Sequence, residues 1–187
     1  VRYGWVLTAF ITLSGDLNKP GLYEVEFAKL TLEDIIYRLG GGITEGNELR
    51  FVIPGGISTA IIRAKDLDFP YSYQGFEKRG SSLGSGAVIA VSQKRNLIDL
   101  MLNVSRFYMN ETCGTCFPCR EGNRQINKIL REFKTKSKKI DADLIADIGN
   151  TIRLAARCGL GQSSLNFITS IIENYGKELE IGGKIYA

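Results

Sequence analysis

The chain has 187 residues, of which 44% are hydrophobic and 24% are charged, as in a globular protein with one large or two small domains. The formal net charge is only +4, so charge alone does not indicate a nucleic acid partner. Much of that charge comes from an expected solvated loop between helices that holds Lys134, Lys136, Lys138 and Lys139. The absence of histidine excludes histidine triads and histidine metal ligands.

Location can also be predicted from the chain. No apolar run approaches the roughly 18 residues of a membrane-spanning helix, so we expect no direct membrane insertion. The first ten residues lack the pattern of a signal peptide, and Val1 is expected to be an internal position of a longer polypeptide or a trimmed start. Four cysteines are too few for a disulfide scaffold, and their metal-like spacing predicts a reducing, cytoplasmic location.

The first half of the chain predicts a small sheet that wraps one helix. Alternating residues over 8–13 and 22–27, joined by a polar turn, predict a hairpin. Thr31 and Asp34 predict a capped helix that ends at the glycines after Leu39. Further strands are expected at 50–53, 60–63 and 87–92. This order predicts a β-grasp, ubiquitin-like module over residues 1–93.

Two glycine-rich segments could be mistaken for phosphate loops. They are Gly55-Gly56 and the run from Gly80 to Gly86. A dinucleotide loop follows a strand and opens a helix, whereas the second run precedes a segment that is expected to be a strand. We therefore interpret these glycines as turn residues.

From about residue 96 the apolar residues recur with the period of a helix. Four amphipathic helices are predicted. The second starts near Pro118–Cys119, and the fourth starts at about Ser163. The third begins at Asp141 or Asp143 and ends at Cys158-Gly159. They predict a four-helix bundle over residues 94–187, and the whole chain is expected to have an α+β fold.

The cysteines lie in a pattern of three plus one. Cys113, Cys116 and Cys119 share one short loop, and Cys158 lies far downstream. A 4Fe–4S cluster uses such a pattern, because a loop holds three corners and another element holds the fourth. Zinc sites usually have two cysteine pairs, so the count favours iron–sulfur, with zinc and unliganded thiols as alternatives.

Residues around the loop suggest how it could tune a metal centre. Cys119 lies at a helix start, which favours a thiolate, and Arg120 adds a cation that could instead form a surface ion pair with Glu121. The backbone N–H of Gly114 could approach a cluster sulfur closely. Phe117 is expected to shield the cluster from water.

Several motifs of the chain resemble those of a known family. In the second half they are 111-ETCGTCFPCREG-122 and 158-CGLG-161. In the first half they are 14-SG-15, 19-KPGLYEV-25, 40-GGG-42, 53-IPGG-56 and 80-GSSLGSG-86. The chain resembles the C-terminal half of the NADH-binding flavoprotein subunit of respiratory complex I, and is equally similar to the diaphorase subunits of NAD(P)-linked hydrogenases and formate dehydrogenases. Thr112 stands where the family usually has Ser, which is a mild change. The first half resembles that subunit's soluble-ligand-binding β-grasp domain.

The resemblance implies an electron-transfer role. It implies a 4Fe–4S cluster on Cys113, Cys116, Cys119 and Cys158 that takes single electrons from FMN reduced by NAD(P)H. The FMN and NAD(P) sites belong to a domain expected upstream of Val1, so this chain alone should not be catalytic.

The expected partners are other redox subunits. They are a ferredoxin- or thioredoxin-like 2Fe–2S subunit, or the iron–sulfur subunit of a hydrogenase or quinone reductase. The alternative from another class is a β-grasp ligand- or protein-binding module with a structural zinc site.

Overall fold

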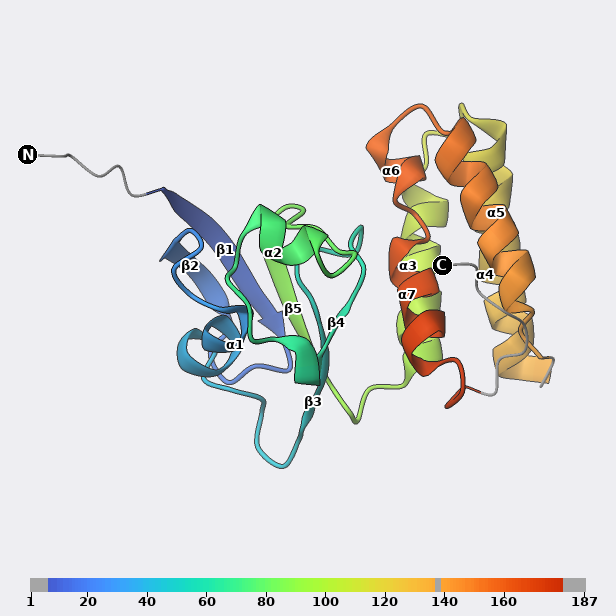
Figure 1. Cartoon of the computed structure of the whole chain (residues 1–187). Helices are drawn as coiled ribbons and strands as arrows, with labels where there is room; N and C mark the ends of the chain where they lie inside the picture. The colour runs from blue at the N-terminus through green and yellow to red at the C-terminus, as the bar shows by residue number, and fades with distance from the viewer. Residues whose placement is uncertain (1–6, 137–138, 180–187) are drawn as a thin grey trace, which may run out of the picture. The chain divides into compact units, whose positions relative to one another are not determined.

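The computed structural model describes residues 7–136 and 139–179, and these have an α+β fold (Figure 1). The chain divides into two compact units, with the boundary between Arg95 and Asn96. The first unit holds a mixed sheet with short helical segments, and the second is helical. Each unit is described by itself below.

Five strands form the sheet of the first unit, in the order β2-β1-β5-β3-β4. The predicted hairpin is confirmed, since β1 (Thr8–Gly15) pairs antiparallel with β2 (Gly21–Glu26). On its other side β1 pairs in parallel with β5 (Ala87–Ser92). Antiparallel to β5 lies β3 (Leu49–Ile53), which also pairs with the short strand β4 (Ile62–Arg63).

The predicted helix start at Thr31 is confirmed. Thr31 Oγ1 accepts a bond from the Asp34 N–H at 3.0 Å, and Asp34 Oδ2 accepts one from the Thr31 N–H at 3.2 Å. The helix begins as α1 (Leu32–Asp34), continues as a π-helical turn, η1 (Ile35–Leu39), and ends at Gly40. Its apolar side chains Leu32, Ile35 and Ile36 are fully buried in the core of the unit. Two shorter helical segments follow, η2 (Ala64–Asp66) and α2 (Tyr73–Glu77).

The glycine-rich segments are turns, as predicted. The run from Gly80 to Gly86 leads into β5 and opens no helix. Gly84 has a φ of +52°, and a Cβ at this position would lie 2.1 Å from the carbonyl oxygen of Gly55. The two loops thus pack backbone against backbone, which only glycine permits here.

An ion pair between a buried carboxylate and an exposed arginine joins the end of β1 to the segment after β5. Asp16, which is 8% exposed, accepts bonds from the backbone N–H of Ser92 at 2.9 Å and from Arg95 Nε at 3.1 Å. The bonds from Arg95 are the main cause that lowers the pKa of the Asp16 carboxyl to about 2. The charged carboxylate therefore joins the end of β1 to the end of the parallel strand β5 and the residues after it.

The second unit contains four helices of ten residues or more and one short helix among the residues that the structure describes. Asn96 caps the first of them and Asp141 caps the third, each through its side chain. The helices are α3 (Leu97–Glu111), α4 (Phe117–Lys136), α5 (Ala142–Ala155), α6 (Gly159–Gln162) and α7 (Asn166–Tyr175).

Two predictions for this unit were wrong. Lys134 was expected in a loop but lies in α4, where it pairs with Asp99 on α3. Lys138 of the expected basic loop lies outside the described residues. The third helix ends at Ala155 and not at Cys158-Gly159, because the chain turns to an extended conformation at Ala156. The carbonyl of Ala156 at the end of α5 has no partner within that helix. It accepts a hydrogen bond from Gln162 Nε2 at 3.0 Å, and Gln162 belongs to the separate short helix α6.

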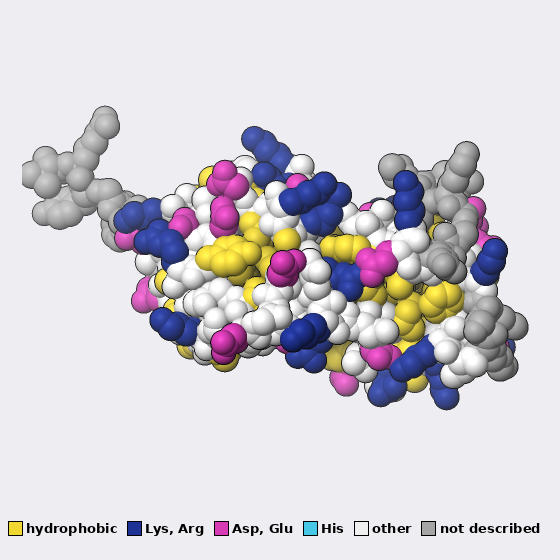
Figure 2. Space-filling model, turned by 90° about the horizontal axis from the view of Figure 1, so that it is seen from below, with side chains coloured by type: hydrophobic (Ala, Val, Ile, Leu, Met, Phe, Trp, Pro, Cys, Tyr) yellow, Lys and Arg dark blue, Asp and Glu magenta, His cyan; other side chains and the backbone are white. Residues whose placement is uncertain are grey.

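The surface carries both signs of charge. On the face shown in Figure 2, Lys and Arg side chains alternate with Asp and Glu side chains. None of the described helices is both long and apolar enough to span a membrane.

Candidate metal centre

The three clustered cysteines lie in the loop before α4 and in the first turn of that helix. The loop after α3 carries Cys113, which is exposed, and Cys116, which is half-buried, and Cys119 lies inside the helix and is 5% exposed. The predicted start of the second helix at this point is confirmed. Pro118 is the second residue of α4, where its missing N–H has no helical partner to lose.

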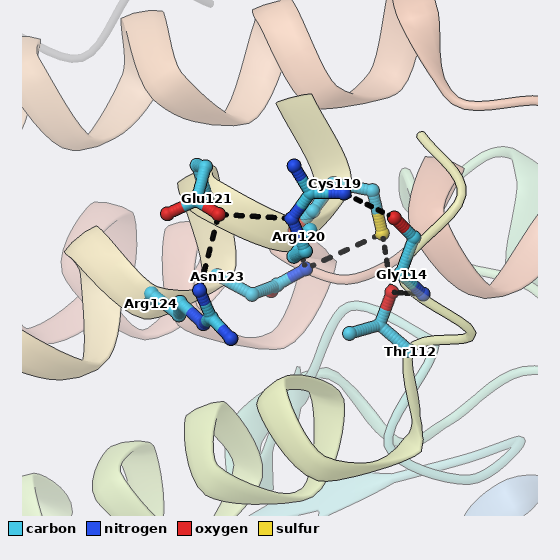
Figure 3. Close-up of polar contacts among 7 residues, drawn as sticks. All are labelled: Thr112, Gly114, Cys119, Arg120, Glu121, Asn123 and Arg124. Atoms are coloured by element: carbon cyan, nitrogen blue, oxygen red, sulfur yellow. Dashed lines mark hydrogen bonds and ion pairs between the residues drawn. The ribbon is translucent and has the colours of Figure 1, made fainter. Parts of the chain in front are cut away.

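Polar groups surround the buried sulfur of Cys119 (Figure 3). Thr112 Oγ1 lies 3.4 Å from Cys119 Sγ, and Asn123 Nδ2 lies 3.6 Å from the same sulfur. Asn123 is 1% exposed, and its amide also donates to the Cys119 carbonyl at 2.8 Å. Such neighbours orient a metal ligand and tune it. Sequence reasoning missed Asn123, although its position one helical turn after Cys119 was a usable signal.

Arg120 holds the loop against the helix. Its Nη1 donates to the Gly114 carbonyl, and its Nε donates to Glu121 Oε1 at 2.9 Å, so the ion pair considered from the sequence is confirmed (Figure 3). Gly114 has a φ of +79°, a conformation that favours glycine. Its N–H faces Thr112 Oγ1 at 3.4 Å.

Phe117 is the first residue of α4 and lies beside Arg120. Its side chain is 66% exposed, and the Arg120 guanidinium carbon lies 5.5 Å from the ring centre. That Phe117 shields the cluster stays a prediction.

Cys113 is the most open of the three loop thiols. Its sulfur and Thr115 Oγ1 are hydrogen-bonded at 3.4 Å. The bonds from the Thr115 hydroxyl and backbone lower the pKa of the Cys113 thiol.

The segment that carries Cys158 packs on Cys119. Cys158 is exposed and forms the N-cap of α6, with no hydrogen bond from its side chain to the helix. Three residues later, a Cβ on Gly161 would lie 3.2 Å from Cys119 Sγ and 2.5 Å from Ala156 Cβ. Cys119 also packs with Ile152 and Ala156, against which Cys116 is packed as well. The structure therefore brings Cys116 and Cys119 together and sets Gly161 of α6 beside Cys119.

The donor set fits one of the two candidate metal centres better than the other. All four cysteines are free thiols. Within the described ranges, no three His, Cys, Asp or Glu side chains are grouped so that they could hold one metal ion. A zinc ion needs its ligands around a single point, at about 2.3 Å for sulfur. A 4Fe–4S cluster binds each thiolate at a different iron, so a loop and a neighbouring helix start with separated thiols fit it better.

Two family models match the chain. The model described as "NADH-ubiquinone oxidoreductase-F iron-sulfur binding region" matches residues 99–182. An SLBB domain model matches residues 10–77. These matches indicate an iron–sulfur binding region in the second unit and an SLBB domain in the first, and the structural-zinc alternative is not favoured.

Curated relatives agree over nearly the whole chain. NADP-reducing hydrogenase subunit HndC of Solidesulfovibrio fructosivorans is 33% identical over 178 residues, which cover 92% of this chain and 35% of that protein. The F subunit of NADH-quinone oxidoreductase of Mycobacterium tuberculosis (strain ATCC 25618 / H37Rv) is 32% identical over 168 residues, or 89% of this chain and 37% of that protein. The chain is similar to these subunits over nearly its whole length, as its sequence predicted, and it spans little more than a third of their length.

A solved structure shares the fold. The crystal structure of an NAD+-reducing [NiFe]-hydrogenase in the air-oxidized state superimposes with a TM-score of 0.80, at 24% identity, over 96% of this chain and 31% of that one. At this identity the likeness supports the fold alone. The relatives are subunits of oxidoreductase complexes, and their names identify hydrogenase and quinone oxidoreductase assemblies.

Proposed function

We propose that this chain is the electron-relaying portion of an NAD(P)H-oxidising flavoprotein subunit. It would pass single electrons from FMN, bound by a domain outside this chain, to a partner subunit. The observation that carries the proposal is the placement of the cysteines: three lie in the loop before α4 and in its first turn, and the helix that begins after the fourth packs on Cys119 through Gly161.

We propose Cys113, Cys116, Cys119 and Cys158 as the ligands of the 4Fe–4S cluster. When bound, such a cluster exchanges one electron at a time with its neighbours. The chain's own residues set the conditions for that exchange. Arg120 holds the loop through Gly114, Asn123 orients Cys119, and the packing of Gly161 on Cys119 keeps water from the inner sulfur.

We propose two domains, at residues 1–93 and 94–187, with a β-grasp fold in the first and a four-helix bundle in the second. The parallel β1–β5 pair beside a capped helix supports the β-grasp. The buried bond from Asn127 Nδ2 to Ser105 Oγ, 2.8 Å long, joins α4 to α3 and supports the bundle.

For the assembly, the proposed partners are a ferredoxin- or thioredoxin-like 2Fe–2S subunit or another iron–sulfur subunit, and the proposed location is the cytoplasm. No nucleic acid and no membrane insertion enter this proposal. The names of the relatives support redox partners of this kind.

The test is metal analysis of protein purified without oxygen. We expect about four iron and four sulfide per chain and, after dithionite, an EPR signal of a reduced cluster. Replacing each cysteine by serine in turn should lower the iron and sulfide content. Cys158→Ser is the decisive variant, because Cys158 is far in sequence from the other three proposed ligands. One zinc per chain, or a Cys158→Ser variant with full iron and sulfide, would contradict the proposal.

A further inference from the structure

A groove on the second unit lies between α3 and α4, away from the cysteine loop. It has a volume of about 390 Å³, and Met109 on α3 is part of its lining. Most of the rest comes from α4, where three cations, Arg124, Lys128 and Arg131, border it. The groove is thus a basic cleft with an apolar side chain in it.

The three cations share one face of α4 because they are spaced by four and three residues. All three are exposed. Among the residues that the structure describes, no ion pair involves Lys128 or Arg131, and Arg124 has only a surface pair with Glu121 at 3.1 Å. Exposed pairs of this kind contribute little, so all three cations are available to a partner.

The cleft is preformed. The Asn127 side chain also lines it, and this residue is 6% exposed and bonded to the buried Ser105 of α3. This bond fixes the spacing of the two helices from which the groove is made. Glu132 is the one carboxylate among its described lining residues, so the cleft has a net positive charge.

We propose that the groove between α3 and α4 docks an acidic segment of a protein partner. Carboxylates would meet the three cations, and an apolar side chain of the segment would lie against Met109. Charge complementarity of this kind governs the choice of partner and the association rate. An α-helix rises about 1.5 Å per residue, so the cations lie roughly 7 to 18 Å along α4 from Cys119. That the partner is the electron acceptor rests on the proposed function, whereas docking itself needs no cluster.

The test measures binding of fluorescein-labelled poly-L-glutamate by anisotropy at low salt. The triple variant Arg124→Glu, Lys128→Glu, Arg131→Glu should bind about tenfold or more weakly, and added salt should weaken binding to the original chain. The matched control reverses three exposed positive charges in the first unit, with Lys65→Glu, Lys78→Glu and Lys94→Glu. It should bind nearly as well as the original chain. Circular dichroism and the three single variants separate lost binding from lost folding.

Several results would overturn the proposal: no binding by the original chain, equal losses in both triple variants, or tighter binding of a single-stranded DNA than of poly-L-glutamate. A groove-dependent dimer in light scattering would assign the face to a second copy instead. Repeating the titration with Cys158→Ser separates the two proposals. If the cluster is absent even from the original chain while poly-L-glutamate binding persists, the relay fails and docking stands.

Discussion

The packing of α6 on Cys119 can be tested by one added methyl group. In Gly161→Ala the new Cβ would lie 2.5 Å from Ala156 Cβ and 3.2 Å from Cys119 Sγ, so at least one of these groups must move. Overpacking of this kind costs typically about 1–3 kcal/mol. Alanine in place of glycine in a helix returns up to about 1 kcal/mol. We therefore expect the free energy of unfolding to fall by roughly 1–2 kcal/mol.

The assay is urea unfolding of the oxygen-free protein, together with its iron and sulfide content. The matched control is Gly159→Ala on the same helix, where an added Cβ meets no atom within 4 Å. That variant should be as stable as the original chain or slightly more so. Because cluster binding is coupled to folding, Gly161→Ala should also lose iron and sulfide, and the control should not. If both variants unfold at the same urea concentration with full iron, α6 does not pack on Cys119 and the assignment of Cys158 loses its support.

Three further predictions concern charge and backbone. Arg120→Ala should lower the reduction potential, because removing a cation disfavours the reduced cluster, and a loss of about 1 kcal/mol corresponds to roughly 40 mV. A redox titration measures the potential, with Arg124→Ala as the control. An unchanged potential in Arg120→Ala would contradict this prediction. Asp16→Asn should destabilise the first unit by about 1–2 kcal/mol at pH 7, since the Asp16 pKa is lowered to about 2 and exposure of Arg95 screens part of the effect. The stabilisation is present above about pH 4 and is lost as pH falls toward 2, so urea midpoints of variant and original chain should converge there; a constant gap would refute it. Gly84→Ala should lower the melting temperature of the first unit and leave cluster absorbance intact; lost absorbance would refute the independence of the two regions.

Local chemistry made much of the fold predictable. Side-chain caps at Thr31 and Asp141 set two helix starts, and both depend only on residues within three positions. The two strands of the hairpin followed from alternation. The loop of three cysteines is likewise a local pattern, so its place at the start of α4 follows from the order of the residues alone.

Contacts between distant residues were beyond sequence reasoning. The parallel pairing of β1 with β5 and the Asp16–Arg95 ion pair join segments more than seventy residues apart, and no local pattern encodes such a pairing. The end of α5 was misplaced for the same reason. A glycine after Cys158 resembles a helix stop, but the packing of α6 on Cys119 makes it the first residue of a new turn.

Residue types and their spacing by themselves favoured an iron–sulfur site, because four thiols in a three-plus-one pattern suit few cofactors, and the motifs around them indicated the family. Tertiary structure alone decided which groups surround those thiols. Gly161 against the Cys119 sulfur and the groove between α3 and α4 both arise from how separate helices pack, whereas Asn123 lies beside that sulfur because it is one turn further along the same helix. The physical reason is that ligand identity is a property of single residues, whereas burial, orientation and charge environment belong to the assembled helices.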